Sequence, residues 1–268
     1  MKSTVYWFSG TGNSYYVASK LASSLPDCTL CRIEKHPGFS VIEPSEIVGI
    51  VLPVYFGGPP AMIKAFIKEQ IPKVSEHIEY LFIVYTHGGL PLYVAPIMER
   101  LLASANVGCS YATGIKMVDS YVPLFKIPDT NTQDAVYERA DKQIAMIADD
   151  IAGQSIKVPT RPILSNLYQR YWDHHIKKYP AGDNRFIVSE ACTKCGQCVL
   201  RCPAGNITLH EQSIKYHHAC EQCFGCYHCC PAHAISFTKK PARGYSWYPN
   251  KRSGFQTYSH TGEHRAQL

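Results

Sequence analysis

A cysteine motif that occurs twice occupies the C-terminal third of this 268-residue chain. Each copy has the spacing C-x₂-C-x₂-C-x₃-C-P, and the second copy begins 28 residues after the first. A run of this kind holds an iron–sulfur cluster, and its fourth cysteine binds the cluster of the other run. Tight turns let the three thiolates of a run converge on one cluster. The motif predicts one [4Fe–4S] cluster on Cys192, Cys195, Cys198 and Cys230, and a second on Cys220, Cys223, Cys226 and Cys202.

Other uses of these cysteines fit the spacing less well. Structural zinc sites typically use two separated cysteine pairs, and disulfides belong to oxidising compartments. Cys229 also follows Cys226 at the C-x₂-C spacing, but the 28-residue repeat and the proline after Cys230 favour Cys230 as the ligand. We expect His217 and His218, between the two runs, to lie in an exposed loop and not to bind metal.

Two further cysteines form a lone C-x₂-C far from this region. Cys28 and Cys31 stand at a predicted connection between a helix and a strand. One interpretation is a redox-active dithiol. Partly buried structural cysteines are favoured, because free cysteine is among the most buried residue types.

The first 155 residues alternate short apolar runs with amphipathic stretches. Residues 47–52 and 81–84 are continuously apolar, apart from one glycine, as in parallel strands covered on both faces. Apolar residues at 94–105 instead recur at i, i+3 and i+4, as on a helix with one buried face. The alternation predicts an α/β fold with a doubly wound parallel sheet of five strands. The predicted strands are Thr4–Phe8, Leu30–Glu34, Ile47–Val54, Leu81–Tyr85 and Val107–Met117.

Three loops follow predicted strands at the same edge of this sheet. The first, Ser9–Ser14, is rich in glycine and hydroxyl groups and precedes a helix, which suits a phosphate held by backbone N–H groups. It has neither the lysine of an ATP-binding P-loop nor the G-x-G-x-x-G spacing of a dinucleotide site. An ordinary capped turn is the alternative. The loops Pro53–Pro60 and Thr86–Tyr93 combine aromatic residues with paired glycines, so they can stack on a planar ring and hydrogen-bond its edge.

With these loops, residues 1–155 resemble the flavodoxin family, whose three FMN-contacting loops have this order and spacing. The resemblance implies bound FMN. Tyr55, Phe56 and Tyr93 each qualify to stack on the ring, although Tyr93 could equally pack in the core. The implied phosphate ligands are Ser9, Thr11, Gly12, Asn13 and Ser14, and the implied ring contacts are Tyr55, Phe56, Gly57, Gly58, Thr86, His87, Gly88, Gly89 and Tyr93.

Residues 184–238 resemble the two-cluster bacterial ferredoxins, a small α+β fold, and Asp183–Val188 looks like the short strand that precedes their first cluster. The order of the parts is similar to the flavodoxin–ferredoxin fusion proteins of anaerobes. The resulting domains are 1–155 (flavodoxin-like), 156–183 (a connector with a helix at Leu164–Ile176), 184–238 (ferredoxin-like) and 239–268 (a basic, aromatic tail).

The implied function is electron transfer between FMN and two [4Fe–4S] clusters, linking a redox protein partner to low-potential ferredoxin-type metabolism. The alternative is an enzyme that reduces a small molecule such as a quinone, with the clusters as the electron entry. His87 is a weak candidate for its catalytic residue, and a hydrogen bond to the flavin ring is the simpler role. We expect a soluble cytoplasmic protein, because the N-terminus offers only four consecutive large apolar residues and no stretch approaches the roughly 20 needed to span a membrane.

The tail carries most of the excess positive charge of the chain, whose formal net charge is +6. Basic and aromatic residues together can bind single-stranded nucleic acid or an acidic protein. We expect the tail to pack over the domains, with an acidic redox partner as the next possibility and nucleic acid as the least. Its basic residues are Lys239, Lys240, Arg243, Lys251, Arg252 and Arg265, and its aromatic residues are Tyr245, Trp247, Tyr248, Phe255 and Tyr258.

Overall fold

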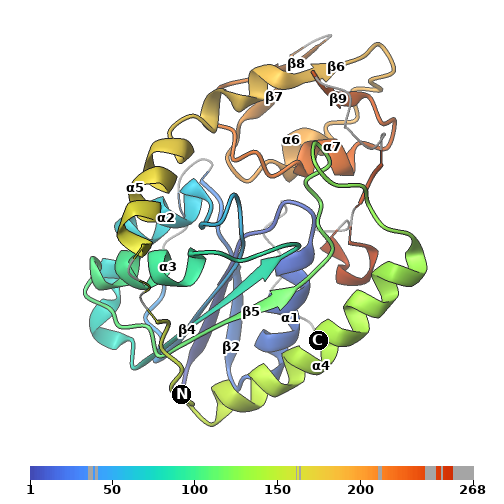
Figure 1. The fold of residues 1–268 in the computed structure, drawn as a ribbon. Coiled ribbons are helices and arrows are strands. Elements are labelled where there is room, and N and C mark those ends of the chain that lie inside the picture. The colour runs from blue at the N-terminus through green and yellow to red at the C-terminus, as the bar shows by residue number, and fades with distance from the viewer. Residues whose placement is uncertain are drawn as a thin grey trace.

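The N-terminal part of the protein is built on a five-stranded parallel sheet (Figure 1). We describe a computed structural model, which covers residues 1–35, 39, 42–160, 162, 164–210, 213–238, 246–248 and 250–255. The strand order is β2-β1-β3-β4-β5, the doubly wound order of the flavodoxin-like fold. The fold class predicted from the sequence is therefore confirmed. The strands are β1 (Ser3–Trp7), β2 (Cys28–Arg32), β3 (Ile47–Pro53), β4 (Tyr80–His87) and β5 (Tyr111–Lys116).

Helices cover both faces of the sheet. Helices α1 (Asn13–Ser24) and α4 (Thr130–Ala152) pack on one face. On the other face lie α2 (Ala61–Glu69), α3 (Val94–Ala103) and the connector helix α5 (Ser165–Ile176). Helices α1 to α4 bury their apolar stripes against the sheet, which is why the central strands are apolar on both faces, whereas α5 packs on α3. Short 3₁₀ helices are η1 (Ile71–Lys73), η2 (Ser75–His77), η3 (Pro180–Arg185) and η4 (Lys251–Ser253).

The cysteine region forms a second, smaller unit beside the carboxyl ends of the strands (Figure 1). Two antiparallel strand pairs flank two short helices. The pairs are β6 (Phe186–Val188) with β9 (Ile235–Phe237), and β7 (Ile207–His210) with β8 (Ser213–Tyr216). The helices are α6 (Gln197–Arg201) and α7 (Gly225–Cys229), and each begins after the second cysteine of its run and includes the third.

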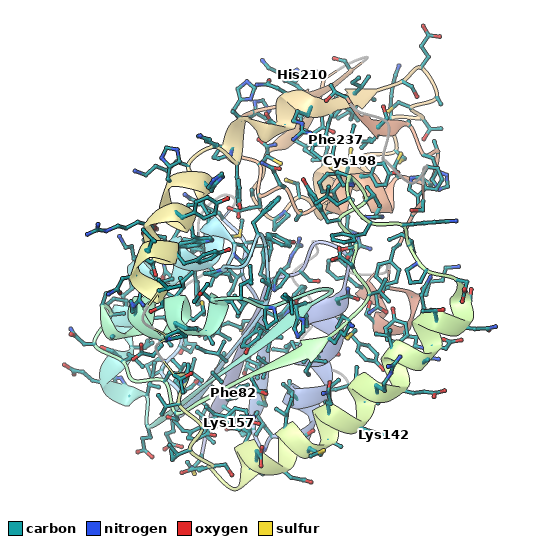
Figure 2. All side chains as sticks on the ribbon, in the orientation of Figure 1. Phe82, Lys142, Lys157, Cys198, His210 and Phe237 are labelled. Carbon is teal, nitrogen blue, oxygen red and sulfur yellow. The ribbon has the colours of Figure 1, made fainter. Side chains whose placement is uncertain are left out.

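One hydrophobic cluster runs through both units. It contains Val5 and Phe82 of the sheet together with Phe186, Tyr227 and Phe237 of the cysteine region. Figure 2 shows Phe82 among the strands and Phe237, close to Cys198, in the smaller unit. Because they share this cluster, the two units are packed against each other and are not joined only by a linker.

The lone C-x₂-C pair lies inside a strand, not at a connection. Strand β2 begins at Cys28, two residues before the predicted start, and includes Cys31. Residues three apart on a strand point to opposite faces. Cys28 accordingly packs with the cluster on one face of the sheet and Cys31 with the cluster on the other. The dithiol interpretation is therefore wrong, and both are partly buried cysteines.

Part of the basic tail packs on the flavodoxin-like unit. Tyr248 and Phe255 are only 2% and 4% exposed, so these two rings cannot stack on the bases of a nucleic acid. Several of the tail residues named above lie outside the described residues: Lys239, Lys240, Arg243, Tyr245, Tyr258 and Arg265. Within the described part of the chain, no helix is both long and apolar enough to cross a membrane.

Candidate functional site

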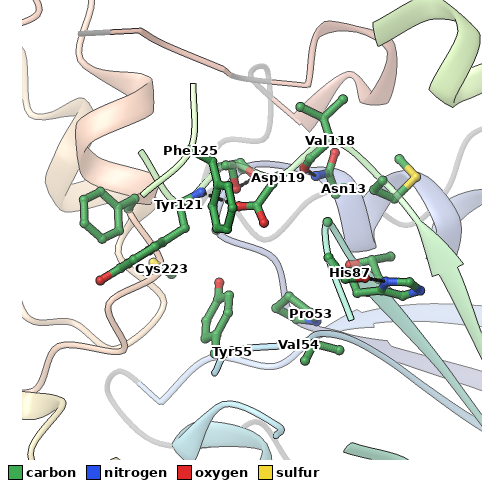
Figure 3. A pocket seen from close by; sticks show the side chains of 18 of the residues that line it. Asn13, Pro53, Val54, Tyr55, His87, Val118, Asp119, Tyr121, Phe125 and Cys223 are labelled. Atoms are coloured by element: carbon green, nitrogen blue, oxygen red, sulfur yellow. Dashed lines mark hydrogen bonds between the residues drawn. The ribbon is translucent and has the colours of Figure 1, made fainter. Parts of the chain in front are cut away.

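A cavity of about 400 Å³ opens at the carboxyl ends of the strands (Figure 3). In a doubly wound sheet this edge is where ligands bind, because the strand order reverses there. The cavity is bounded by the three predicted loops and by two segments that the sequence did not suggest, 117–125 and 222–224. Of the site residues predicted from the sequence, those that line the cavity are Ser9, Thr11, Asn13, Ser14, Tyr55, Phe56, Gly57, Thr86, His87, Gly88 and Gly89.

The Ser9–Ser14 loop turns directly into helix α1. Gly12 precedes the helix with φ at 99°, a left-handed conformation that favours glycine. The hydroxyl of Ser9 accepts a hydrogen bond from the Gly12 N–H at 2.9 Å, and the hydroxyls of Ser14 and Thr86 lie 2.8 Å apart. Thr11 donates to the hydroxyl of Ser120 at 3.2 Å. The loop thus presents hydroxyl groups at the N-terminal end of a 12-residue helix, a favourable place for an anion.

Asn13 lines this cavity, but its side chain already bonds protein groups through both Nδ2 and Oδ1. Its Nδ2 donates to the carbonyl of Val118 at 2.9 Å. Its Oδ1 accepts from the Tyr248 hydroxyl at 2.8 Å and from Asn250 Nδ2 at 3.2 Å. Asn13 can therefore offer a phosphate its backbone N–H, while its amide group holds the surrounding chain.

The second loop forms a tight turn below the cavity. Tyr55 and Gly58 exchange two backbone hydrogen bonds, of 2.9 and 3.1 Å, and Phe56 and Gly57 between them both have positive φ. This turn carries Tyr55, Phe56 and Gly57 to the cavity. Gly58 does not line it: a Cβ on Gly58 would run into the indole of Trp172, behind the loop.

The third loop contributes Thr86, His87 and two glycines to the cavity, but not Tyr93. The Tyr93 ring packs against Tyr168 of α5, with 4.5 Å between ring centroids, so the structure does not place it with the other two ring-stacking candidates. The Nδ1 of His87 lies 2.5 Å from the carbonyl oxygen of Gly89. Burial lowers the pKa of His87, which favours the neutral imidazole.

The segment after β5 forms a wall of the cavity that sequence analysis missed. Asp119, Tyr121 and Phe125 face the same space as Tyr55 (Figure 3). Asp119 Oδ1 accepts a hydrogen bond from the Tyr121 N–H at 2.9 Å, and burial raises the pKa of its carboxyl. The position of this segment, at the carboxyl end of the last parallel strand, was the signal that could have revealed it.

The eight motif cysteines surround two further, smaller cavities in the ferredoxin-like unit. The structure brings the cysteines together in the same two sets of four that the motif predicts. One cavity is lined by Cys192, Cys195, Cys198 and Cys230, and the other by Cys202, Cys220, Cys223 and Cys226.

These cavities have the chemistry that an iron–sulfur cluster requires. Backbone N–H groups point at the sulfurs: Asn206 N–H donates to Cys202 Sγ at 3.3 Å and Ala234 N–H to Cys230 Sγ at 3.3 Å. Such bonds stabilise thiolates and the cluster they hold. Among the described residues, we find no group of three or more His, Cys, Asp or Glu side chains that could hold a single metal ion.

The structure also locates three residues beside the motif cysteines, namely Cys229, His217 and His218. Cys229 lines neither cavity, and its thiol instead lies 3.5 Å from the carbonyl oxygen of Cys226. His217 and His218 are exposed, as expected, although His218 Nδ1 lies 2.7 Å from the buried carboxylate of Asp183. This pairing fixes the loop between the two runs.

Cys223 belongs to two cavities at once. It lines the large cavity at the sheet edge and also the cavity of the second cysteine set. It lies directly against the first loop, since a Cβ added to Gly10 would collide with the Cys223 carbonyl oxygen and would lie 2.8 Å from Cys223 Cβ. The large cavity and the second cysteine set therefore share a wall.

Residues 186–208 match the family described as "4Fe-4S binding domain". The chain is thus a flavodoxin-like unit followed by a ferredoxin-like iron–sulfur region. No curated protein matches it. The match covers the first cysteine run and indicates a 4Fe–4S cluster.

Several solved structures are similar to part of this chain. A flavoprotein from Lactobacillus acidophilus NCFM, solved with FMN, is 13% identical with a TM-score of 0.37, over 42% of this chain and 92% of its own. The Trp repressor binding protein from Bacillus subtilis is 12% identical with a TM-score of 0.38, over 56% and 98%. Megasphaera elsdenii flavodoxin is 13% identical with a TM-score of 0.34, over 52% and 98%. The sequence identities and TM-scores are low, so the fold is assigned from the strand order of the sheet.

Proposed function

We propose that this protein is an electron-transfer iron–sulfur flavoprotein that binds FMN in the large cavity and two [4Fe–4S] clusters in the ferredoxin-like unit. When bound, FMN exchanges one or two electrons and each cluster exchanges one. The observation that carries the proposal is the position of Cys223 in the walls of both the large cavity and the second cysteine set. One chain then connects two-electron and one-electron chemistry through a shared wall.

The large cavity suits FMN in size and in chemistry. Its volume of about 400 Å³ is within the usual range of small-molecule sites. The hydroxyl-rich loop Ser9–Ser14 and the start of α1 would hold the phosphate. Tyr55 and Phe125 offer rings for stacking, and the backbone around Gly57 and Gly88 can hydrogen-bond the edge of the flavin and so tune its potential.

The two cysteine sets differ in their most exposed member. Cys195 of the first set is exposed, whereas all four cysteines of the second set are partly buried. We propose that a redox protein partner exchanges electrons at the first set, and that the second set connects the first to the flavin cavity. This order links the partner to low-potential ferredoxin-type chemistry.

Anaerobic purification tests the cofactor content. We expect about one FMN, eight irons and eight sulfides per chain, with flavin and cluster absorption that bleaches on reduction. Replacing Cys192→Ala should remove about half of the iron and leave FMN in place. A protein that carries no flavin, or only four irons when fully reconstituted, would contradict the proposal.

A second candidate function is the two-electron reduction of a small apolar molecule such as a quinone. The observation that favours it is an apolar rim of exposed side chains at the large cavity. This rim consists of Phe56, Leu90, Leu92, Leu124 and Phe125. Steady turnover of a water-soluble quinone with reduced ferredoxin, with a KM that rises in Leu124→Ser, would support it, and a lack of turnover by the FMN-loaded protein would exclude it.

A further inference from the structure

The described part of the C-terminal segment packs behind the Ser9–Ser14 loop. We call residues 246–248 and 250–255 the C-terminal clasp. Asn250 is fully buried, and Tyr248 and Phe255 are nearly so. A polar side chain buried this completely needs hydrogen-bond partners, and the clasp finds them in the loop.

The contacts of the clasp fall on the two loop residues Thr11 and Asn13. The Asn250 N–H donates to the carbonyl of Thr11 at 2.9 Å. Asn250 Nδ2 and the Tyr248 hydroxyl both donate to Asn13 Oδ1, at 3.2 and 2.8 Å. These bonds hold the Thr11 carbonyl and the Asn13 side chain, on either side of Gly12, from behind.

The clasp also requires glycine at the centre of the loop. A Cβ on Gly12 would lie 2.8 Å from Ser253 Oγ, 3.1 Å from Phe255 Cβ and 3.2 Å from Asn250 Cβ. Gly12 is thus constrained twice, by its positive φ and by this close approach.

Both ends of the clasp are anchored to the ferredoxin-like unit. The Tyr248 N–H donates to Nδ1 of the buried His228 at 2.9 Å, and His228 Nε2 lies 2.9 Å from the carbonyl oxygen of Ser120 in the cavity wall. At the other end, Arg201 of α6 donates to the carbonyl of Phe255. The clasp is therefore held at both ends by groups of the protein itself.

We propose that the C-terminal clasp is a positioning element of the phosphate-binding site, and that Asn250 and Tyr248 hold the Ser9–Ser14 loop in its anion-binding conformation through Thr11 and Asn13. This inference rests on the proposed FMN site. Without these bonds Asn13 Oδ1 is left partly unsatisfied and the loop is free to adopt other conformations, so binding must first order it.

The test compares two flavins on the full-length protein from which flavin has been removed. FMN carries the phosphate and riboflavin lacks it, and the affinity of each is measured from the quenching of flavin fluorescence. In Asn250→Ala we expect FMN affinity to fall by about ten- to a hundredfold and riboflavin affinity to stay within about twofold. Tyr248→Phe, which removes only one hydroxyl, should show a smaller loss of FMN affinity with the same selectivity.

Lys251→Ala is the matched control, because Lys251 belongs to the clasp and its side chain is exposed. It should leave both affinities unchanged. If both flavins weaken equally in Asn250→Ala and Tyr248→Phe, or neither weakens, the clasp does not position the phosphate site. If the unaltered protein binds no FMN, the proposed function itself fails, and the two failures are thus distinguishable.

Discussion

Gly10 of the first sheet loop lies directly against Cys223 of the second cysteine run. A Cβ on Gly10 would lie 2.8 Å from Cys223 Cβ, and a Cβ on Gly225 would in turn lie 2.9 Å from the Gly10 carbonyl oxygen. Neither position leaves room for a side chain. This close backbone contact joins the loop proposed to bind phosphate to the loop proposed to bind a cluster.

Substituting Gly10→Ala should disrupt this contact. Because the nearest atoms of Cys223 belong to its backbone and Cβ, they cannot move aside, and we expect a loss of stability of about 1–3 kcal/mol with a loss of bound FMN. Gly108→Ala is the control, since a Cβ there meets nothing within 4 Å. Thermal unfolding and flavin content are the measurements. If the two variants have the same melting temperature and the same flavin content, the close contact at Gly10 is contradicted.

Iron content distinguishes the ligand Cys230 from its neighbour Cys229. The thiol of Cys229 lies outside both cysteine cavities, so Cys229→Ala should keep about eight irons per chain. Cys230→Ala removes a residue of the first set and should leave about four. Iron analysis after anaerobic reconstitution checks both variants, and a loss of iron in Cys229→Ala alone would reverse the assignment.

The thiols of the flavodoxin-like unit should react slowly in the folded protein. Burial raises the pKa of Cys109 to about 12 and that of Cys28 to about 11. At pH 8 the reactive thiolate of Cys109 is then about a thousandfold scarcer than in an ordinary thiol with a pKa near 9. Alkylation followed by mass spectrometry should show modification of Cys109 only after unfolding. Rapid labelling of the native protein would show that the site is open.

The carboxyl of Asp119 should make stability depend on pH. Burial raises its pKa above the ordinary 3.8, so the folded state binds the proton more tightly than the unfolded state. The contribution of Asp119 is therefore most favourable at low pH and is lost as pH rises through the folded-state pKa. Asp119→Asn should remove this dependence of stability on pH. Between pH 4 and 7, its melting temperature should therefore rise relative to that of the unaltered protein. A constant difference across that range would argue against the raised pKa.

Much of the fold followed from local patterns in the sequence. The apolar runs at 47–52 and 81–84 form the central strands β3 and β4, because a strand that is buried on both faces has apolar side chains at consecutive positions. The cysteine runs were equally informative, since ligand spacing is local. Tyr93 was ambiguous because its position in the loop fits either role. Its actual partner, Tyr168, lies in the connector helix, 75 residues further along the chain.

The parts of the site that sequence did not suggest depend on distant contacts. Asn13 is held by Tyr248, which lies 235 residues away, and no local pattern encodes such a pair. The sequence drew attention to the charge of the tail, yet the hydrogen bonds from its described part to the Ser9–Ser14 loop come from the buried, neutral residues Tyr248 and Asn250. Asp119 follows a strand end without glycine pairs, so only the general rule for the edge of the sheet pointed to it.

The most direct test of the account is the electron paramagnetic resonance of the partly reduced, fully loaded protein. If Cys223 places the second cluster in the wall of the flavin cavity, the flavin radical signal should relax quickly and resist power saturation once that cluster is reduced and paramagnetic. In Cys220→Ala, which lacks a ligand of this set, the flavin signal should saturate at low power, like that of an isolated flavin. Low-power saturation in the unaltered protein with both clusters reduced would contradict the shared wall on which the proposed function depends.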